Sequence, residues 1–298
     1  MTAMQARKLK EALGAEVLGV KLPALDDAAF AELQQVWRTH GALLVRGQQE
    51  MTDGQFEAFS RRFGELDSPP NQGVGRKNVP GHPNLYVVSN ETDTSGEPLG
   101  ALGYSEAVWH TDMSYLPVPP IASMLWALKL PAWGGNTSVV GMCAAYDNLP
   151  GKLKERVESL RIKHDGTRDS AGNLRKGVEA DDNPMTCRGQ PHPAVIRDPG
   201  TGRPALYLGR RPRAYVMGLP LQESEALLDD LWGHAVQPSN VYEHVWQKGD
   251  VLIWSNYATM HRRDEFDKKT IRRMHRSQIK GTSAPVPYFA SRHTSSGV

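Results

Sequence analysis

A histidine and a carboxylate stand two positions apart in this chain, at His110 and Asp112, and a further histidine follows much later, at His261. On an extended strand His110 and Asp112 would project to the same face, because strand side chains alternate with a period of two residues. If His261 folds back to meet them, two imidazoles and one carboxylate surround one side of a metal ion and leave the other side open. This set of donors favours non-haem Fe(II) in oxygen chemistry.

The His110-Thr111-Asp112 triplet by itself is weak evidence for a metal site. With 10 His and 33 acidic residues in 298, about one His-x-acid triplet is expected by chance, and one is found. A partly buried histidine hydrogen-bonded within a core explains the triplet at least as well. Two histidines and a carboxylate with an open position also suit catalytic zinc. Other parts of the chain must therefore decide between these readings.

A threonine behind two glycines and a pair of arginines extend the pattern. Thr137 directly follows Gly134-Gly135-Asn136, where glycine lets the backbone pass close to a ligand. Arg272 and Arg276 come 11 and 15 residues after His261 on a strand-like run, and their spacing of four predicts that both side chains share one face.

The elements that must position these residues begin with two helices around a short strand. A helix is predicted after Asp26 and ends near Gly41, residues 42–45 form a buried strand, and Thr52 caps a second helix that stops at Gly64. The apolar side chains at helical spacing are Phe30, Leu33 and Trp37 in the first helix and Phe56, Phe59 and Phe63 in the second.

After the second helix, short apolar or alternating runs are separated by Gly, Pro, Asn and Asp. The predicted strands cover residues 85–89, 121–130, 138–141, 194–197, 205–208, 242–246, 251–254 and 271–279, with helical patterns at 152–160 and 223–235. Many short strands divided by turns indicate a sandwich or a barrel. No internal repeat or linker divides the chain, so we predict a single domain over residues 1–298.

Two polar stretches and a group of basic residues complete the pattern. Residues 165–190 are rich in Gly, Asp and Arg, and a segment of this length in a compact domain is usually a functional lid or a disordered loop; we predict an active-site lid. Residues 292–298 are predicted to be a frayed tail. We expect the remaining basic residues near the second histidine to form a solvated face; these are Arg262, Arg263, Lys268, Lys269 and Arg273.

Composition sets broad limits on the class of protein. The 35 basic and 33 acidic residues nearly cancel, which disfavours binding to nucleic acid or to a membrane surface through bulk charge. The two cysteines, Cys143 and Cys187, argue against a disulfide-stapled secreted domain. Without a signal-peptide pattern at the start or an apolar run long enough for a membrane span, we expect a cytoplasmic globular protein.

Taken together in this order and spacing, the histidines, Asp112, Thr137 and the two arginines resemble the TauD/TfdA-like family of Fe(II)/2-oxoglutarate-dependent dioxygenases. The resemblance extends from Leu18-Gly19-Val20 to the 272–281 run and so covers most of the chain. Other similar segments are Phe59-Ser60-Arg61-Arg62-Phe63-Gly64, residues 131–137, His192-Pro193-Ala194-Val195, Leu206-Tyr207-Leu208 and Gly218-Leu219-Pro220.

The resemblance implies a mainly β fold with flanking helices (α+β) around a double-stranded β-helix (jelly-roll, cupin-like) core. It assigns Fe(II) to His110, Asp112 and His261, with O2 and 2-oxoglutarate as cosubstrates. The distal carboxylate of 2-oxoglutarate is costly to bury unpaired, and a planar guanidinium with a hydroxyl stabilises it best. This task is assigned to Arg272 and Thr137. Arg276 belongs to the same pocket, where it contacts the cosubstrate or the anionic end of the substrate, and Trp246 matches a lining position.

By the same resemblance, 2-oxoglutarate is converted to succinate and CO2 while a small-molecule substrate is hydroxylated, and the product cleaves where the hydroxylated carbon carries a sulfonate or an aryloxy group. A sulfonate, an aryloxy acid or an amino acid is expected. Taurine is disfavoured, because Pro69 and Glu106 replace the histidine and asparagine that hold it in taurine-specific members. Glu106 could instead face a cationic group. Arg210 or Arg211 could pair with an anionic group of the substrate, or both could belong to a surface turn.

Two other functions stay open at this point. A zinc hydrolase would use the same three ligands, although it would have no need of the arginine pair beyond His261. A non-catalytic metal-binding barrel would commonly have lost those ligands, and all three are present. The resemblance also leaves a homo-oligomer, a dimer or a tetramer, open.

Overall fold

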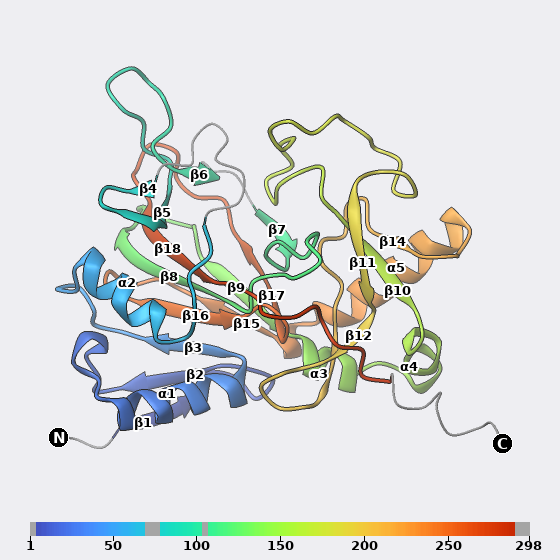
Figure 1. Ribbon diagram of the computed structural model, residues 1–298, viewed down its shortest axis with the longest axis horizontal. Helices are drawn as coiled ribbons and strands as arrows, with labels where there is room; N and C mark the ends of the chain where they lie inside the picture. The colour runs from blue at the N-terminus through green and yellow to red at the C-terminus, as the bar shows by residue number, and fades with distance from the viewer. Residues whose placement is uncertain (1–3, 69–77, 103–106, 290–298) are drawn as a thin grey trace.

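Two β-sheets packed against each other form the centre of the molecule, which is described by a computed structural model for residues 4–68, 78–102 and 107–289 (Figure 1). The large sheet has the strand order β1-β2-β3-β16-β8-β18-β5-β4 with β6 beside β5, and the small sheet has the order β15-β9-β17-β7. Neighbouring strands are antiparallel except for the pairs β2–β3 and β5–β6. The mainly β core with flanking helices agrees with the fold implied by the sequence.

The strands of the large sheet are β1 (Gln5–Lys8), β2 (Ala15–Leu18), β3 (Ala42–Val45), β4 (Asn78–Val79), β5 (His82–Ser89), β6 (Ala101–Leu102), β8 (Ala122–Lys129), β16 (Val251–Ser255) and β18 (Arg273–Ile279). Those of the small sheet are β7 (Ala107–His110), β9 (Thr137–Gly141), β15 (Val241–His244) and β17 (Thr259–Arg263). Two further small sheets contain β10 (Arg161–Asp165), β11 (Gly189–Pro193) and β14 (Tyr215–Val216), and β12 (Val195–Arg197) with β13 (Pro204–Leu206).

The central strand β16 is apolar up to its last residue because both faces of the large sheet are covered. In β16, Val251 and Ile253 pack on the side of the helices, whereas Leu252 and Trp254 pack between the two sheets. Val139 of β9 closes the inner core from the small sheet. The polar residues of the candidate site lie against this inner core.

Helices α1 (Asp27–His40) and α2 (Asp53–Arg61) cover the outer face of the large sheet, as Figure 1 shows. Both helices begin where the sequence predicts, and α1 ends as predicted at Gly41, whereas α2 ends at Arg61, before the predicted stop at Gly64. Asp26 accepts a hydrogen bond from the backbone N–H of Ala29 at 2.8 Å, and Gly41 ends α1 with a φ of 70°, a conformation that favours glycine. Thr52 forms a capping box at the start of α2. The six apolar side chains predicted to share helix faces are all buried.

A second core lies beyond the small sheet, where α3 (Met142–Asp147), α4 (Gly151–Val157) and α5 (Leu221–Ala235) pack on β10 to β14 (Figure 1). Val140 of β9 and Met260 of β17 belong to this core, so the small sheet is shared between the two halves of the molecule. Short 3-10 helices complete the chain at η1 (Leu22–Ala24) and η2 (Pro238–Asn240).

The sequence placed His110 on an extended strand, where β7 lies, but it predicted no strand for β17, which carries His261. β7 has four residues and only Ala107 is fully buried, and β17 contains Arg262 and Arg263, which resemble a solvated loop. Both strands pair within the small sheet, and that long-range pairing leaves no local signal in the sequence.

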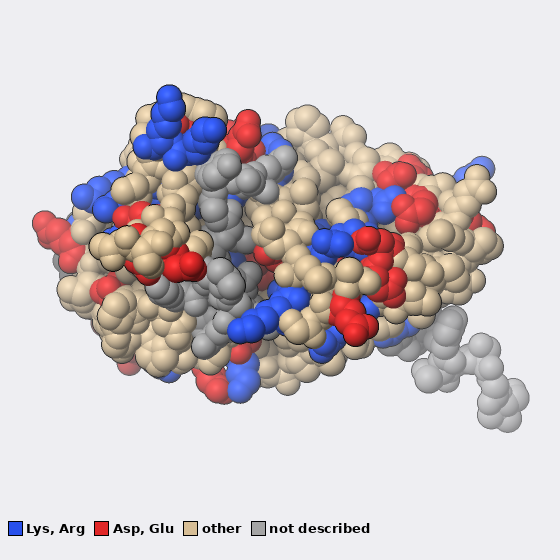
Figure 2. Space-filling view, turned by 90° about the horizontal axis from the view of Figure 1, so that it is seen from above, with Lys and Arg blue, Asp and Glu red and all other residues tan. Residues whose placement is uncertain are grey.

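Charged side chains are dispersed over the surface. In the face seen in Figure 2, lysine and arginine are interspersed with aspartate and glutamate, in line with the formal net charge of +2. Among the described residues, no helix is both long enough and apolar enough to span a membrane.

Candidate active site

The side chains of His110, Asp112 and His261 converge at the open end of the small sheet. His261 lies opposite His110 in the antiparallel pairing of β17 with β7, and their ring centroids are 4.2 Å apart. Oδ1 of Asp112 lies 3.5 Å from Nε2 of His110 and 3.8 Å from Nε2 of His261. One donor atom of each residue lies within 4.8 Å of the others, so a single ion could contact all three.

Asp112 reaches this position from a turn and not from the strand, which corrects the prediction that both residues lie on one extended strand. β7 ends at His110, and Met113 has a φ of 49°, a left-handed conformation that turns the chain back. The backbone N–H of Thr111 donates to the carbonyl of Gly209 at 3.0 Å and fixes the start of this turn.

The hydrogen bonds around the three side chains direct their free donor atoms toward one point. Nδ1 of His110 lies 2.7 Å from the carbonyl oxygen of Val108, so Nδ1 carries the proton and Nε2 keeps a free lone pair. Oδ2 of Asp112 accepts a hydrogen bond from Ser123 at 2.8 Å and also forms an ion pair with Arg276. Oδ1 therefore remains available beside the two imidazoles.

The protonation states also suit a cation. Burial would raise the pKa of Asp112, but the charge of Arg276 holds this pKa well below its usual range. Burial lowers the pKa of the His261 imidazole well below its usual value, against the opposing charge of Asp112. An ionised carboxylate and neutral imidazoles are the forms that bind metals, so these residues fit a ferrous ion.

An inner pocket opens beside the two imidazoles and reaches toward Thr137 and Arg272. Its walls are formed by Val88, Ala107, His110, Leu125, Thr137, Trp254, His261, Arg263, Arg272 and Arg276. The structure thus brings together the histidines, Thr137 and both arginines that the sequence singled out. The pocket joins the candidate metal ligands to a group of buried cations.

Arg272 is a buried cation that no carboxylate among the described residues neutralises. Its side chain is 1% exposed, Nε donates to the carbonyl of Gly135 at 3.2 Å, and Nη2 has no hydrogen-bond partner in the described part of the chain. Burial, and next the nearby charge of Arg263, lower the pKa of Arg272 well below its usual value. A buried guanidinium without a carboxylate partner would be stabilised by an anionic ligand.

Thr137 offers its hydroxyl proton to the same pocket. Nε1 of Trp246 donates to Oγ1 of Thr137 at 3.1 Å, which uses the oxygen as an acceptor and leaves the hydroxyl proton free for a carboxylate. Trp246 itself is buried behind Thr137 and is not part of the pocket wall. The expectation that Trp246 lines the pocket is therefore corrected to an indirect contact through Thr137.

Arg263 is a site residue that the sequence reasoning missed. It was expected on a solvated face, yet it is 6% exposed and lines the inner pocket, and burial lowers its pKa to about 10. The signal was its position two residues after His261, which places both side chains on one face once residues 259–263 are known to form a strand. Nδ1 of His275 lies 2.6 Å from Oδ1 of Asp53, and His275 lines neither pocket.

Arg276 lines both the inner pocket and an outer pocket on the other side of Asp112. Its Nη2 forms the ion pair with Asp112 and donates to Ser123 at 3.0 Å. Its guanidinium carbon lies 5.3 Å from the ring centroid of Tyr86 and 5.7 Å from that of Trp254. Burial alone would lower the pKa of Arg276, but Asp112 and then Tyr86 raise it, so the side chain is charged.

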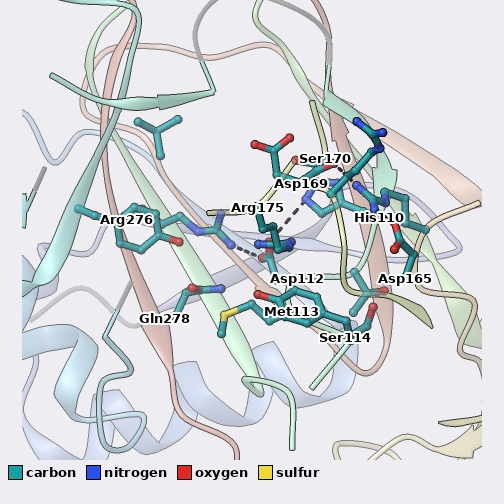
Figure 3. A pocket seen from close by; sticks show the side chains of 16 residues that line it. His110, Asp112, Met113, Ser114, Asp165, Asp169, Ser170, Arg175, Arg276 and Gln278 are labelled. Atoms are coloured by element: carbon teal, nitrogen blue, oxygen red, sulfur yellow. Dashed lines mark hydrogen bonds and ion pairs between the residues drawn. The ribbon is translucent and has the colours of Figure 1, made fainter. Parts of the chain in front are cut away.

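The outer pocket lies between the metal-ligand turn and the 166–188 segment (Figure 3). Its walls are formed by Tyr86, Val88, His110, Thr111, Asp112, Met113, Ser114, Tyr115, Asp165, Arg168, Asp169, Ser170, Arg175, Arg210, Arg276 and Gln278. The segment predicted to be a lid therefore supplies part of the wall. A backbone hydrogen bond of 3.1 Å from Val108 to Ser170 ties it to β7.

The structure separates the two arginines that were expected to meet a substrate anion. Arg210 lines the outer pocket, but it is paired with Asp165 and also donates to the carbonyl of Asp169. Arg211 is not in the pocket wall, because it pairs with Glu225 at 2.7 Å and Asp229 at 2.6 Å on α5. The expectation for Arg211 is therefore wrong. Glu106, expected to face a cationic group, and Pro69 lie outside the described residues.

Comparison with known proteins places this geometry in context. The family model described as "Taurine catabolism dioxygenase TauD, TfdA family" matches residues 5–278. A (S)-phenoxypropionate/alpha-ketoglutarate-dioxygenase of Sphingobium herbicidovorans is 35% identical over 291 residues, covering 95% of this chain and 96% of the relative. An alkylsulfatase of Acinetobacter baylyi is 32% identical over 266 residues, covering 87% of this chain and 79% of the relative.

A solved structure also resembles the chain over most of its length. The crystal structure of AAD-2 in complex with Mn(II) and N-oxalylglycine superimposes with a TM-score of 0.76 at 29% sequence identity. The match covers 96% of this chain and 100% of that chain.

Proposed function

The chain belongs to the TauD/TfdA family and is an Fe(II)- and 2-oxoglutarate-dependent dioxygenase, and we propose that it hydroxylates, and thereby cleaves, a small aryloxyalkanoic acid. Neither the zinc hydrolase nor the non-catalytic barrel is supported by its relatives. The proposals below concern which residues perform the reaction and which acid is the substrate.

His110, Asp112 and His261 are the proposed ligands of the ferrous ion. When bound, iron supplies the activation of O2 that couples decarboxylation of 2-oxoglutarate to oxidation of a C–H bond. The residues themselves hold the donors in place: Val108 fixes the tautomer of His110, and Ser123 with Arg276 holds one oxygen of Asp112 so that the other faces the imidazoles. The test is metal binding by Asp112→Ala, which should lose Fe(II) because two imidazoles alone are a weak site for it.

The observation that supports the cosubstrate site best is the buried guanidinium of Arg272, which has no carboxylate partner among the described side chains. In the proposed assignment this cation binds the distal carboxylate of 2-oxoglutarate, and Thr137 donates its hydroxyl proton to the same group. The keto acid end would then lie toward His110 and His261, which line the same pocket. The apolar side chains Val88 and Leu125 exclude water from the region between them.

The outer pocket supports an aromatic acid as the substrate. Tyr86 and Tyr115 offer aromatic surface, and Arg168, Arg175 and Arg276 offer positive charge, among the residues that line the pocket. Two relatives at 35% and 31% identity are named as acting on (S)-phenoxypropionate. Hydroxylation of the carbon that carries the aryloxy group leaves a hemiketal, which falls apart to a phenol and a 2-keto acid without further catalysis.

An alkyl sulfate ester is the second candidate, favoured by the 32% identity to the alkylsulfatase. A sulfate group would suit the same arginines. The experiment measures succinate formed with Fe(II), O2 and 2-oxoglutarate in the presence of each enantiomer of 2-phenoxypropionate, phenoxyacetate, an alkyl sulfate and taurine. Phenol released in step with succinate would support the aryloxy acid as the substrate. Succinate formed only when the alkyl sulfate is present would support the alkyl sulfate ester in its place.

Several further proposals concern the protein as a whole. The small sheet contributes Val139 to the inner core and Val140 and Met260 to the second core, which supports one domain over residues 1–298. Residues 165–190 are proposed to act as a lid over the outer pocket, and their deletion should abolish substrate affinity. The two cysteines are free and buried, which is compatible with the proposed cytoplasmic location. A homo-oligomer is also proposed, and light scattering would measure its mass.

A further inference from the structure

A buried histidine lies behind the inner pocket, next to the hydroxyl group assigned to the cosubstrate. His244 is the cross-strand partner of Thr137 in the antiparallel pairing of β15 with β9, and directly opposed residues of this kind lie side by side. Its imidazole also packs against the indole of Trp246, with ring centroids 4.5 Å apart and planes at 79°. Because Trp246 donates to Thr137 at 3.1 Å, His244 lies beside both partners of this hydrogen bond.

Two polar groups hold the imidazole of His244, whose side chain is fully buried. Nδ1 lies 3.1 Å from the hydroxyl oxygen of Tyr242. Nε2 lies 3.0 Å from Oδ2 of Asp250, but outside the geometry of a hydrogen bond, so this contact is chiefly electrostatic. The imidazole therefore has a fixed neighbour at each of its two nitrogens.

Asp250 connects His244 to the turn that follows Trp246. Its Oδ2 accepts a hydrogen bond from the backbone N–H of Gln247 at 2.9 Å, and its own N–H donates to the carbonyl of Gln247 at 3.0 Å. Arg46, directly after β3, donates to the same Oδ2 at 2.7 Å and pairs with its charge. One buried carboxylate thus contacts the residues on both sides of Trp246, the imidazole before it and the backbone after it.

We propose that His244 is a positioning residue for the cosubstrate, because it fixes the indole of Trp246 against the hydroxyl of Thr137. Asp250 in turn holds the imidazole. An indole N–H can only donate, so it occupies the hydroxyl oxygen and leaves the hydroxyl proton to the pocket. This inference rests on the proposed role of Thr137 and extends it to His244 and Asp250, which do not line the inner pocket.

The first measurement observes the hydrogen bond of Trp246 in the protein without metal or cosubstrate. The protein is labelled with 15N at its tryptophans, and the indole N–H signal that is missing in Trp246→Phe identifies this residue. His244→Leu, which removes the ring that packs on the indole, should increase exchange of this N–H with solvent by at least about tenfold. His275→Leu is the matched control, since His275 is also a buried histidine beside a carboxylate, Asp53, and should leave the exchange unchanged.

The second measurement is cosubstrate binding, by calorimetry of 2-oxoglutarate to the protein loaded with Mn(II) in the absence of O2. His244→Leu should weaken this binding by about fivefold, the usual effect of one lost hydrogen bond, and leave the affinity for Mn(II) unchanged. Combined with Thr137→Val, which removes the hydroxyl, His244→Leu should cause no further loss, because both changes remove the same interaction. His275→Leu should bind 2-oxoglutarate as the unmodified protein does.

The outcomes separate the positioning role from the cosubstrate site on which it rests. Unchanged 2-oxoglutarate affinity in Thr137→Val would refute both. Weaker binding in Thr137→Val with unchanged binding in His244→Leu would refute the positioning role alone, and so would an equal loss from His244→Leu with and without Thr137→Val. If His244→Leu does not fold, Asp250→Asn, which keeps the size of the side chain, takes its place with the same direction of change expected in both measurements.

Discussion

The hydroxyl of Ser123 donates its proton to Oδ2 of Asp112 at 2.8 Å, and its other hydrogen bonds within the described part of the chain are ones that it accepts. Three groups donate hydrogen bonds to Oγ of Ser123: Arg276 Nη2 at 3.0 Å, Gln278 Nε2 at 3.3 Å and Asn256 Nδ2 at 3.4 Å. A hydroxyl has one proton and two lone pairs, so these donors fill its accepting side. Ser123 is therefore a positioning residue that holds Oδ2 and turns Oδ1 toward the two imidazoles.

Ser123→Ala should weaken metal binding by about 10- to 100-fold, because groups that orient a ligand commonly contribute this much. The affinity for Mn(II) is measured by titration followed by electron paramagnetic resonance. Ser277→Ala is the control, since Ser277 is equally buried but contacts Ser60 at 2.8 Å and not Asp112. It should lower stability without changing Mn(II) affinity. Unchanged Mn(II) affinity in Ser123→Ala would contradict the positioning role.

Arg272→Met should have opposite effects on stability and on cosubstrate binding. Without 2-oxoglutarate the substitution removes a buried charge that no carboxylate of the described chain compensates, so we expect the free energy of unfolding to rise by roughly 1–2 kcal/mol. The requirement for 2-oxoglutarate should rise by about 10- to 100-fold, because its distal carboxylate loses a charge-assisted partner.

Thermal unfolding with and without 2-oxoglutarate in the presence of Mn(II) measures both effects of Arg272→Met. The unmodified protein should gain stability with 2-oxoglutarate, and the variant should gain little at the same concentration. Mn(II) binding itself should persist, because Arg272 contacts none of the three ligands. If the variant were still stabilised by low concentrations of 2-oxoglutarate, Arg272 would not be part of the cosubstrate site.

Gly135 has a specific role in placing Arg272. It has a φ of 69°, and a Cβ atom at this position would lie 3.0 Å from both Cδ and Nε of Arg272. Gly135→Ala should therefore cost about 1 kcal/mol through backbone strain and should also raise the requirement for 2-oxoglutarate by displacing the guanidinium. Gly177→Ala shares the strain, with a φ of 71°, but has no atom within 4 Å of the added Cβ. If both variants raised the requirement for 2-oxoglutarate equally, the contact between residue 135 and Arg272 would not be the cause.

The sequence predicted the parts of the fold whose signals are local. The helix containing Phe56 and Phe59 was predictable because these residues repeat at helical spacing behind a capping threonine, and β16 because a run of four apolar residues needs cover on both faces. β17 was not predictable, since its only support is pairing with distant strands.

The same limit applies to the candidate site. His110, Asp112, His261 and Arg272 were identified by residue type and spacing, and the structure brings them together. Arg263 was missed because its charge indicates solvent whereas its position on β17 buries it. Ser123 gave no signal, since a serine within an apolar strand has many neutral explanations. Its role depends on Asn256 and Gln278, which are far away in the sequence.

Buried histidines should make the protein sensitive to mild acid. Burial, followed by the charge of neighbouring His192, lowers the pKa of His164 well below its usual 6.5, and burial also lowers that of His192. The folded state keeps these imidazoles neutral while the unfolded chain takes up protons as the pH falls through 6.5. Since the unfolded state then binds more protons, the free energy of unfolding decreases with decreasing pH below about 6.5 and is nearly constant from pH 7 to 8.

The slope of this decrease assigns it to particular residues. Nε2 of His192 lies 3.0 Å from the carbonyl of Leu116, a contact that a glutamine amide can replace without titrating. His192→Gln should therefore reduce the loss of stability between pH 6.5 and 5 by up to about 1.4 kcal/mol per pH unit, whatever its effect at pH 8. His234→Gln is the control, because His234 lies on the partly exposed side of α5, 3.5 Å from Asp230. If chemical unfolding gave the same pH slope for His192→Gln and the unmodified protein, the acid sensitivity would have to arise elsewhere.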